Sequence, residues 1–314
     1  MQKLIHHTLR WLLLILLIFA ISLFFISGPD YYSSRSFKSL WDQGHILVYT
    51  VFMFYLLRFF PWFGTLSISK QLGWTLLMTL ATGIIIELVQ IDFKRFPEAG
   101  DIWRDCLGSA FALIYFSRSF KLISAAYINF WKFLIIILII VEFSNPAKAI
   151  IDENISRKQF PVLSGFETPF ETDRWEPREK IRRSGTHTAD GKYSAEINLT
   201  TEKYSGVSLK YFPRNWQNYA YLCFSIYNSS KQSLMLICSI HDWEYTEKGR
   251  QNRDRFSKKL IIQPGWNRVR ISILEIQRGP RDRLLNLQKI YSLGFFASYL
   301  KKPQRIYLDE VKLE

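Results

Sequence analysis

The sequence has few residues of the kind that form covalent cross-links or metal clusters. Cysteine occurs only 3 times among 314 residues, and Cys106 lies in an apolar segment where we expect an inert small side chain. Cys223 and Cys238 stand at equal distances on either side of an expected turn at residues 228–233. In a simple hairpin they would face each other across the strands. A disulfide and two buried free thiols are both compatible with this spacing.

Signatures of the common catalytic machineries are also absent from the sequence. It has no serine–histidine–aspartate order, no His-Glu-x-x-His motif, no phosphate-cradling glycine loop and no cysteine-rich metal motif. A clustered nucleic-acid-binding motif is missing too, although 41 Lys and Arg against 27 Asp and Glu give a net charge of +14. The sequence therefore favours binding or a structural role over catalysis. Its charge favours anionic lipids or cell-wall polymers as partners, and not nucleic acid.

Long apolar runs fill the first half of the chain. The first run follows Lys3 and Arg10 but lacks the small-x-small cleavage site of a signal peptide, so we expect an uncleaved anchor. Hydropathy predicts a lipid-embedded domain of residues 1–144 with about five transmembrane spans. The predicted spans are residues 11–27, 45–60, 72–91, 102–116 and 128–143.

The distribution of lysine and arginine between these segments suggests an orientation. More basic residues fall on the cytoplasmic side when the N-terminus is placed inside, as the positive-inside rule requires. With five spans, everything after about Asn145 is then exported. The predicted location is the bacterial inner membrane, as a multi-pass protein with an extracytoplasmic C-terminal domain.

Ionisable side chains interrupt the apolar runs between residues 83 and 108. Glu87 and Gln90 stand three apart in one segment, and Asp101 and Asp105 stand four apart in the next, so each pair lies on one helix face. Ionisable groups at membrane depth cost several kcal/mol unless they are paired or hydrated. We expect a buried polar cluster here. The alternative is a hairpin whose charges mark where the chain leaves the bilayer.

These motifs resemble the signature of the VanZ-like membrane protein family over about residues 10–120. The similar stretches are Asp42-Gln-Gly-His45 with Tyr49, Glu87-Leu-Val-Gln90, Arg95 in the hairpin, and Asp101-Ile-Trp-Arg-Asp105-Cys-Leu-Gly108. The resemblance implies a membrane polar site made of Asp42, His45, Tyr49, Glu87, Gln90, Arg95, Asp101 and Asp105, with Arg95 as partner for a lipid phosphate.

Two residues depart from the family pattern. Asp105 stands where the family usually has Asn, and Gln43 stands where it usually has Lys. Family roles that depend on this charge balance are therefore not carried over. The resemblance implies binding or shielding of envelope lipids or cell-wall precursors, in the manner of low-level glycopeptide-antibiotic resistance. An intramembrane enzyme of envelope lipid or glycan metabolism and a partner-binding scaffold are the alternatives.

The composition changes near residue 145. Residues 145–161 contain Pro146, mixed charge and no sustained period, so we predict a linker. Residues 162–314 contain about eight short alternating segments separated by turn signals, typical of an antiparallel β-sandwich. The predicted fold class is an N-terminal α-helical transmembrane bundle followed by a C-terminal all-β jelly-roll sandwich.

The order of motifs in residues 162–314 resembles the galactose-binding-like jelly roll of carbohydrate-binding modules, which closes with a strand like Ile306-Tyr-Leu-Asp-Glu-Val-Lys-Leu313. The resemblance implies a structural calcium ion between Glu167 and Asp309, which occupy the matching positions. A surface role for Asp309 is the alternative. No other cofactor is expected.

Sugar recognition requires exposed aromatic faces beside planar polar groups. A loop-rich stretch near residues 241–255 offers both, whereas Trp175, Trp216 and Trp266 are expected to pack in the core or anchor loops. The other interpretation of the sandwich is a module that binds a protein partner. The carbohydrate-binding candidates are His241, Asp242, Trp243, Tyr245, Arg253 and Arg255.

Overall fold

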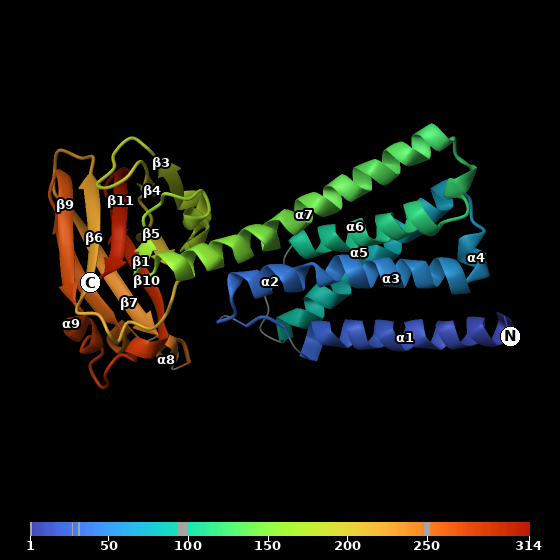
Figure 1. Ribbon diagram of the computed structural model, residues 1–314, viewed down its shortest axis with the longest axis horizontal. Helices are drawn as coiled ribbons and strands as arrows, with labels where there is room; N and C mark the ends of the chain where they lie inside the picture. The colour runs from blue at the N-terminus through green and yellow to red at the C-terminus, as the bar shows by residue number, and fades with distance from the viewer. Residues whose placement is uncertain (1, 27, 31, 93–98, 248–251) are drawn as a thin grey trace. The chain divides into compact units, whose positions relative to one another are not determined.

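The computed structural model of the protein describes residues 2–26, 28–30, 32–92, 99–247 and 252–314 (Figure 1). The chain divides into two compact units, residues 1–148 and residues 149–314. The first is helical, and the second is an antiparallel β-sandwich, in agreement with the predicted order of fold classes.

The helical unit is built from long helices that coincide with the predicted apolar segments. Its elements are α1 (Gln2–Ile26), α2 (Arg35–Asp42), α3 (Gly44–Phe59), α4 (Pro61–Gly64), α5 (Ile68–Asp92), α6 (Ala99–Phe116), the short turn η1 (Phe120–Leu122) and the first part of α7 (Ala125–Gln159).

The number of membrane spans predicted from hydropathy is not confirmed. Among the described residues, two helices are long and apolar enough to cross a membrane, namely His7–Phe24 within α1 and α7. Helix α3 has 16 residues, and α6 carries three charged residues in its first turns. Both fall short of the roughly 20 apolar residues that span a bilayer.

Polar side chains lie inside the helical unit, and large apolar side chains lie on its surface. Buried hydroxyl groups of Thr79 and Ser109 are 2.8 Å apart between α5 and α6, and Ser117 donates to Gln71 at 2.6 Å. In contrast, Ile15 on α1 is 61% exposed and Phe133 on α7 is 67% exposed. Apolar side chains such as Met53 and Phe63 are buried as well, so the helical unit is apolar both inside and on its surface.

Close backbone contact holds α3 against α6. A Cβ atom added to Gly108 would lie 2.3 Å from the carbonyl oxygen of Ile46, so only glycine permits this approach. The Thr50 hydroxyl, one turn along α3, donates to the Gly108 carbonyl at 3.1 Å. Small residues at helix crossings and hydrogen bonds across them are characteristic of helix packing in membranes.

We predict that Gly108→Val destabilises the helical unit by about 1–3 kcal/mol or more, because the added side chain overpacks the α3–α6 contact. Gly73→Val is the matched control, since a Cβ at Gly73 has no atom within 4 Å. Thermal unfolding of the two variants in detergent measures the difference. Equal midpoints would contradict the assigned contact.

The predicted linker at residues 145–161 is wrong over most of its length, because α7 continues through Pro146 to Gln159. Ala149, Asp152 and Ser156 are buried at helical spacing. Asp152 accepts hydrogen bonds from Nε and Nη2 of Arg174, at 3.0 Å and 2.8 Å, and both side chains are buried. The end of α7 is thus an integral part of the second unit, and Asp152 anchors it there.

Two antiparallel sheets form the sandwich (Figure 1). The six-stranded sheet has the order β3-β4-β11-β6-β9, with β1 paired to β11, and the five-stranded sheet has the order β2-β5-β10-β7-β8. The strands are β1 (Val162–Ser164), β2 (Trp175–Glu176), β3 (Ile181–Ser184), β4 (Ser194–Leu199), β5 (Tyr204–Leu209), β6 (Tyr221–Asn228), β7 (Leu234–Asp242), β8 (Phe256–Ile262), β9 (Gly265–Ser272), β10 (Ile290–Ser298) and β11 (Gln304–Leu313). Short helices α8 (Trp243–Glu247) and α9 (Ile273–Gln277) follow β7 and β9.

The hairpin predicted to bring two cysteines together does not form. Cys223 lies on β6 and Cys238 lies on β7, and these consecutive strands belong to different sheets. Both are free thiols. Cys238 packs in the core between the sheets, and this burial raises the pKa of its thiol.

Candidate functional site

The polar cluster predicted in the helical half centres on His45 of α3. Its Nδ1 atom lies 2.8 Å from Oδ1 of Asp105, and its Nε2 atom lies 3.6 Å from Oδ2 of Asp101, both on α6. The ring of Phe24 stacks on the imidazole with 4.3 Å between centroids. His45 is 3% exposed and Asp105 1% exposed, so this contact is enclosed by helices.

Four further residues extend the cluster. The hydroxyl of Tyr49 lies 3.0 Å from that of Thr82 on α5. Arg104 donates to Asp101 at 2.6 Å and interacts electrostatically with Asp42 at the end of α2. The structure therefore brings together Asp42, His45, Tyr49, Asp101 and Asp105 of the predicted membrane site.

The other three members of the predicted membrane site are not covered by these contacts. Glu87 and Gln90 belong to α5 by their backbone, but their side chains lie outside the described part of the chain. Arg95 also lies outside the described residues. Their assignment to the site stays a prediction.

Asp242, the central residue of the predicted sugar-binding stretch, is held by a buried ion pair. Arg283 contacts both carboxylate oxygens of Asp242, at 2.5 Å and 2.7 Å, and also contacts Asp254 at 2.6 Å. The backbone N–H of Asn286 donates to the same carboxylate at 2.7 Å. Because Asp242 is 0% exposed, its oxygens serve the loops around β7 and not an incoming ligand.

The ion pair also sets the protonation of this carboxyl. Burial by itself raises the pKa of Asp242, but hydrogen bonds from Arg283 and from the backbone N–H of Asn286 outweigh burial, and the pKa is lowered below its ordinary value. A folded-state pKa below the unfolded value, about 3.9, contributes stability at higher pH. That contribution is lost as the pH falls through the lowered pKa.

We predict that Arg283→Ala destabilises the sandwich by about 3–5 kcal/mol at neutral pH, since it leaves a buried carboxylate unpaired. The loss should shrink below about pH 4, where Asp242 becomes protonated in the variant. Urea unfolding at pH 7 and at pH 3 measures both effects. Arg278→Ala, an exposed arginine after α9, is the control and should be neutral at both values. A loss that does not depend on pH would contradict the ion-pair assignment.

The remaining predicted sugar-binding residues lie around the Asp242 ion pair. The His241 ring is 4.5 Å from that of Tyr245, which is buried, and the guanidinium of Arg255 lies 5.8 Å from the Tyr245 ring. Lys289 lies 5.5 Å from the ring of Trp243. Arg253 is exposed. Their assignment to sugar binding stays a prediction, and the Tyr245 ring is buried against His241 and Arg255.

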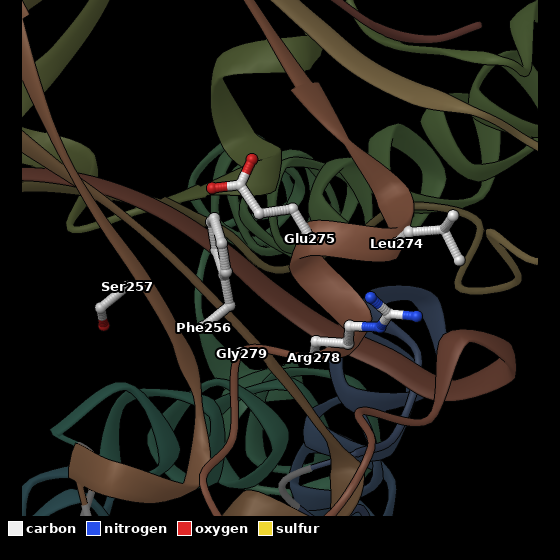
Figure 2. Close-up of a pocket in the computed structure, with 6 residues that line it drawn as sticks. All are labelled: Phe256, Ser257, Leu274, Glu275, Arg278 and Gly279. Atoms are coloured by element: carbon white, nitrogen blue, oxygen red, sulfur yellow. The ribbon is translucent and has the colours of Figure 1, made fainter.

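A separate pocket of about 480 Å³ lies where β8 begins and α9 ends (Figure 2). Glu275 in its wall is paired with Lys258 at 2.9 Å. Gly279 packs against Phe256, because a Cβ at Gly279 would lie 2.6 Å from the Phe256 Cα atom. The six lining residues are Phe256, Ser257, Leu274, Glu275, Arg278 and Gly279, and none of them was a predicted site residue.

The two carboxylates assigned to calcium are bonded to backbone N–H groups of one loop. Glu167 Oε1 accepts from Lys192 at 2.8 Å and from Tyr193 at 3.0 Å, while Asp309 Oδ2 accepts from Ala189 at 2.8 Å. N–H donors repel a cation, and calcium requires six to eight oxygen ligands. In the described part of the chain, no cluster of three metal-ligating side chains occurs. This arrangement does not fit a calcium ion, and both carboxylates anchor residues 189–193 instead.

A row of aromatic side chains crosses the outer face of the six-stranded sheet. Strand register places Trp266 of β9 beside Tyr227 of β6, and Tyr227 beside Tyr307 of β11. The imidazole of His187 stacks on Tyr227 at 3.9 Å and meets Tyr307 edge-on at 4.7 Å. We call these four residues the aromatic row. All four lie on a single face of the sandwich: Trp266 is exposed, Tyr227 and His187 are partly exposed, and Tyr307 is buried beneath the edge of the His187 ring.

Charged groups continue the row on the same face. Glu196 of β4 pairs in register with Tyr307 and accepts a hydrogen bond from its hydroxyl at 3.2 Å. Arg182 and Arg305 both contact the Glu196 carboxylate, at 2.7 Å and 3.1 Å. Two guanidinium groups thus share one carboxylate, and both remain more than half exposed.

A pocket of about 500 Å³ opens beside the aromatic row. His187 and Tyr307 form its aromatic wall, while Asn198, Gln304 and Arg305 add planar polar groups. The Oε1 atom of Gln304 is buried and has no hydrogen-bond partner among the described residues. An aromatic wall beside planar polar groups can accept a ligand that has both an apolar face and hydroxyl groups.

Sequence reasoning missed the aromatic row. Trp266 was expected in the core or as a loop anchor, yet it is 37% exposed on the sheet surface. The available signal was that Tyr227 and Tyr307 alternate with core residues along their strands. The order in which β9, β6 and β11 pair does not follow the chain, so this signal alone does not bring the rings together.

Comparison with known proteins gives matches among solved structures. No protein-family model matches the chain, and no curated protein matches it. The sandwich is similar to the family 11 carbohydrate-binding module from Clostridium thermocellum in complex with a β-1,3-1,4-mixed-linked tetrasaccharide, with a TM-score of 0.36 and 15% identity over 48% of this chain and 93% of that chain.

Two further matches are of the same kind. The family 30 carbohydrate-binding module of a cellulosomal cellulase of Clostridium thermocellum has a TM-score of 0.33 and 15% identity, over 43% of this chain and 82% of that chain. An exo-β-agarase has a TM-score of 0.32 and 11% identity, over 43% of this chain and 22% of that chain. The similarity is weak in each case, so any ligand of this chain has to be inferred from its own residues.

Proposed function

We propose that this protein is a membrane-anchored glycan-binding protein of the cell envelope, and that the aromatic row is its sugar-binding surface. The observation that carries the proposal is the continuous alignment of Trp266, Tyr227, His187 and Tyr307 on one face of the six-stranded sheet.

The chemistry of a pyranose fits this surface. One face of the ring presents C–H groups, which pack on aromatic side chains, and the hydroxyl rim forms hydrogen bonds with planar polar groups. Asn198, Gln304 and the two arginines on Glu196 lie beside the rings and supply such groups. Asn198 is exposed and contributes an accessible amide to this set.

The rigidity of the loop that carries His187 supports the same assignment. Ser194 donates a hydrogen bond to the His187 carbonyl at 2.5 Å, and Glu167 and Asp309 hold the residues that follow. A preorganised site loses little conformational entropy when it binds. The role of Glu167 and Asp309 in this proposal is to fix the loop, without a metal ion.

Membrane anchoring is assigned to the helical unit. Exposure of the apolar surface of α1 and α7 to water is unfavourable, and the interhelical hydrogen bonds of the unit lie inside it. The VanZ-like resemblance of residues 10–120 agrees with this assignment. A bilayer is then the first partner of the protein, and an envelope glycan or lipid-linked precursor is the second.

The polar cluster around His45 has a structural role in this proposal. The cluster is enclosed, and the same unit contains other interhelical polar contacts, such as Thr79 with Ser109. Such contacts hold helices together where apolar packing alone is not selective. The alternative is an intramembrane enzyme that uses His45 and Asp105 as an acid–base pair. An enzyme would turn over a substrate, whereas a structural cluster would not.

We predict that Trp266→Ala and Tyr227→Ala each weaken glycan binding about tenfold or more, because loss of one ring on which a sugar stacks removes about 1–3 kcal/mol of apolar burial. Titration calorimetry of the full chain in detergent measures this, with a mixed-linked β-glucan tetrasaccharide and soluble peptidoglycan fragments as probes.

The matched control for the row is Leu284→Ala, which removes an apolar side chain that is 60% exposed and lies elsewhere on the sandwich. It should leave binding unchanged. The loop variants Trp243→Ala and Arg253→Ala test the stretch predicted from the sequence. If Trp266→Ala and Tyr227→Ala bind glycan normally while the loop variants bind it more weakly, the binding site lies in that loop and not on the aromatic row.

We predict that the chain stays in the membrane fraction after alkaline carbonate extraction, because α1 and α7 are held by apolar burial and not by charge. A protease added outside intact spheroplasts should cleave residues 162–314 if the sandwich is exported. Complete release by carbonate would exclude anchoring by these helices. Protection of the sandwich in spheroplasts, with cleavage after lysis, would place it in the cytoplasm.

A further inference from the structure

The outer face of the five-stranded sheet has an apolar half that the proposed function does not use. Strand register sets Met235 of β7 opposite Ile261 of β8. One row further along the same face, Ile237 lies beside Phe296 of β10. Tyr204 of β5 makes an edge contact with Phe296, 6.0 Å between ring centroids. We call these five residues the apolar patch.

Three side chains of the apolar patch are strongly exposed, and Ile237 and Phe296 are partly exposed. Met235 is 47% exposed, Tyr204 57% and Ile261 69%. Their strands alternate strictly here, with Leu234, Leu236 and Leu260 turned into the core. The exposure is thus a property of the sheet register and not of a loose loop. Contiguous exposed apolar side chains usually mark an interaction surface.

Lysines surround the apolar patch. They come from the strand β8 and from three loops at the end of the sandwich where β10 ends, and all are exposed. None of them forms an ion pair within the described parts of the chain, and the carboxylate of Glu202 nearby is taken by Lys180. The five lysines are Lys203, Lys231, Lys259, Lys301 and Lys302.

We propose that the apolar patch and its lysines dock the sandwich onto an anionic lipid bilayer. Exposed aliphatic and aromatic side chains gain by entering the boundary between headgroups and acyl chains. Lysine ammonium groups at the rim are attracted to the negative surface potential of acidic phospholipids. Charge complementarity selects this occupant, because an apolar protein partner would not require five unpaired cations around the patch.

The proposal assigns different partners to the two outer faces of the sandwich. The aromatic row lies on the six-stranded sheet, and the apolar patch lies on the five-stranded sheet packed behind it. Lipid docking through the second sheet therefore leaves the first sheet free. The docking proposal does not depend on glycan binding, and each face can be tested with the other left intact.

The experiment places an environment-sensitive fluorophore on each face of the full chain. Met235→Cys labels the apolar patch, and Arg268→Cys on β9 labels the opposite sheet. In both, Cys106 and Cys223 are replaced by alanine, while Cys238 is retained because it is 0% exposed. The labelled proteins are reconstituted into vesicles of phosphatidylcholine, with or without phosphatidylglycerol.

We expect blue-shifted emission and quenching by nitroxide-labelled lipids at position 235 in phosphatidylglycerol vesicles. At position 268 neither change should occur. Combining Lys301→Glu with Lys302→Glu should lower the ratio of docked to undocked protein about tenfold, since each charge near an anionic surface contributes separately. Emission at 235 that is unaffected by lipid charge, or equal quenching at 235 and 268, overturns the proposal.

A second copy of the chain is the competing occupant of the apolar patch. Self-association would give a blue shift at position 235 that rises with protein concentration in neutral detergent micelles and persists in the lysine variants. This result would also overturn the proposal. Glycan titration of the protein labelled at position 235, on the opposite sheet from the aromatic row, is a separate measurement. A loss of glycan binding with normal lipid quenching would contradict only the assignment of the aromatic row.

Discussion

Backbone pairing of the closing strand β11 is the constraint on which the sandwich depends. This strand lies inside the six-stranded sheet and pairs with β1, β4 and β6. By pairing with β1, it connects the first strand of the sandwich to the last. Two of its outward side chains have roles on the surface: Tyr307 belongs to the aromatic row, and Asp309 holds the loop that carries His187. A bulge follows Asp309, where Glu310 has a φ of 52°. The bulge changes the register beyond Asp309, so Val311 and Leu313 still face the core.

The helical unit depends on a different constraint, the matching of polar groups inside a bundle whose outside is apolar. Its hydroxyl, imidazole and carboxylate groups find partners on neighbouring helices, and glycine at position 108 lets two backbones meet. In the sandwich, apolar side chains fill the space between the sheets, and the buried charges are paired or accept hydrogen bonds from backbone N–H groups.

Sequence patterns predicted the features that repeat along the chain, but they did not predict the contacts between distant segments. Apolar periodicity located the helices, and alternation located a β-sandwich. Pro146 was interpreted as the start of a linker, although the spacing of Ala149, Asp152 and Ser156 continued a helix. Asp242 was predicted to bind sugar from its place in a loop-rich stretch. Its partner Arg283 is 41 residues away, and no local pattern indicates their contact. The aromatic row depends on a strand order that single-sequence reasoning does not provide.

The burial of Cys238 gives the protein an internal reporter of its own integrity. Its thiol lies in the core between the sheets and is shielded from solvent, and the same burial raises its pKa, so the reactive thiolate is scarce in the folded state. A thiol reagent reaches this sulfur only when the sheets separate. The rate at which Cys238 is modified therefore measures how often the sandwich opens, without any added label.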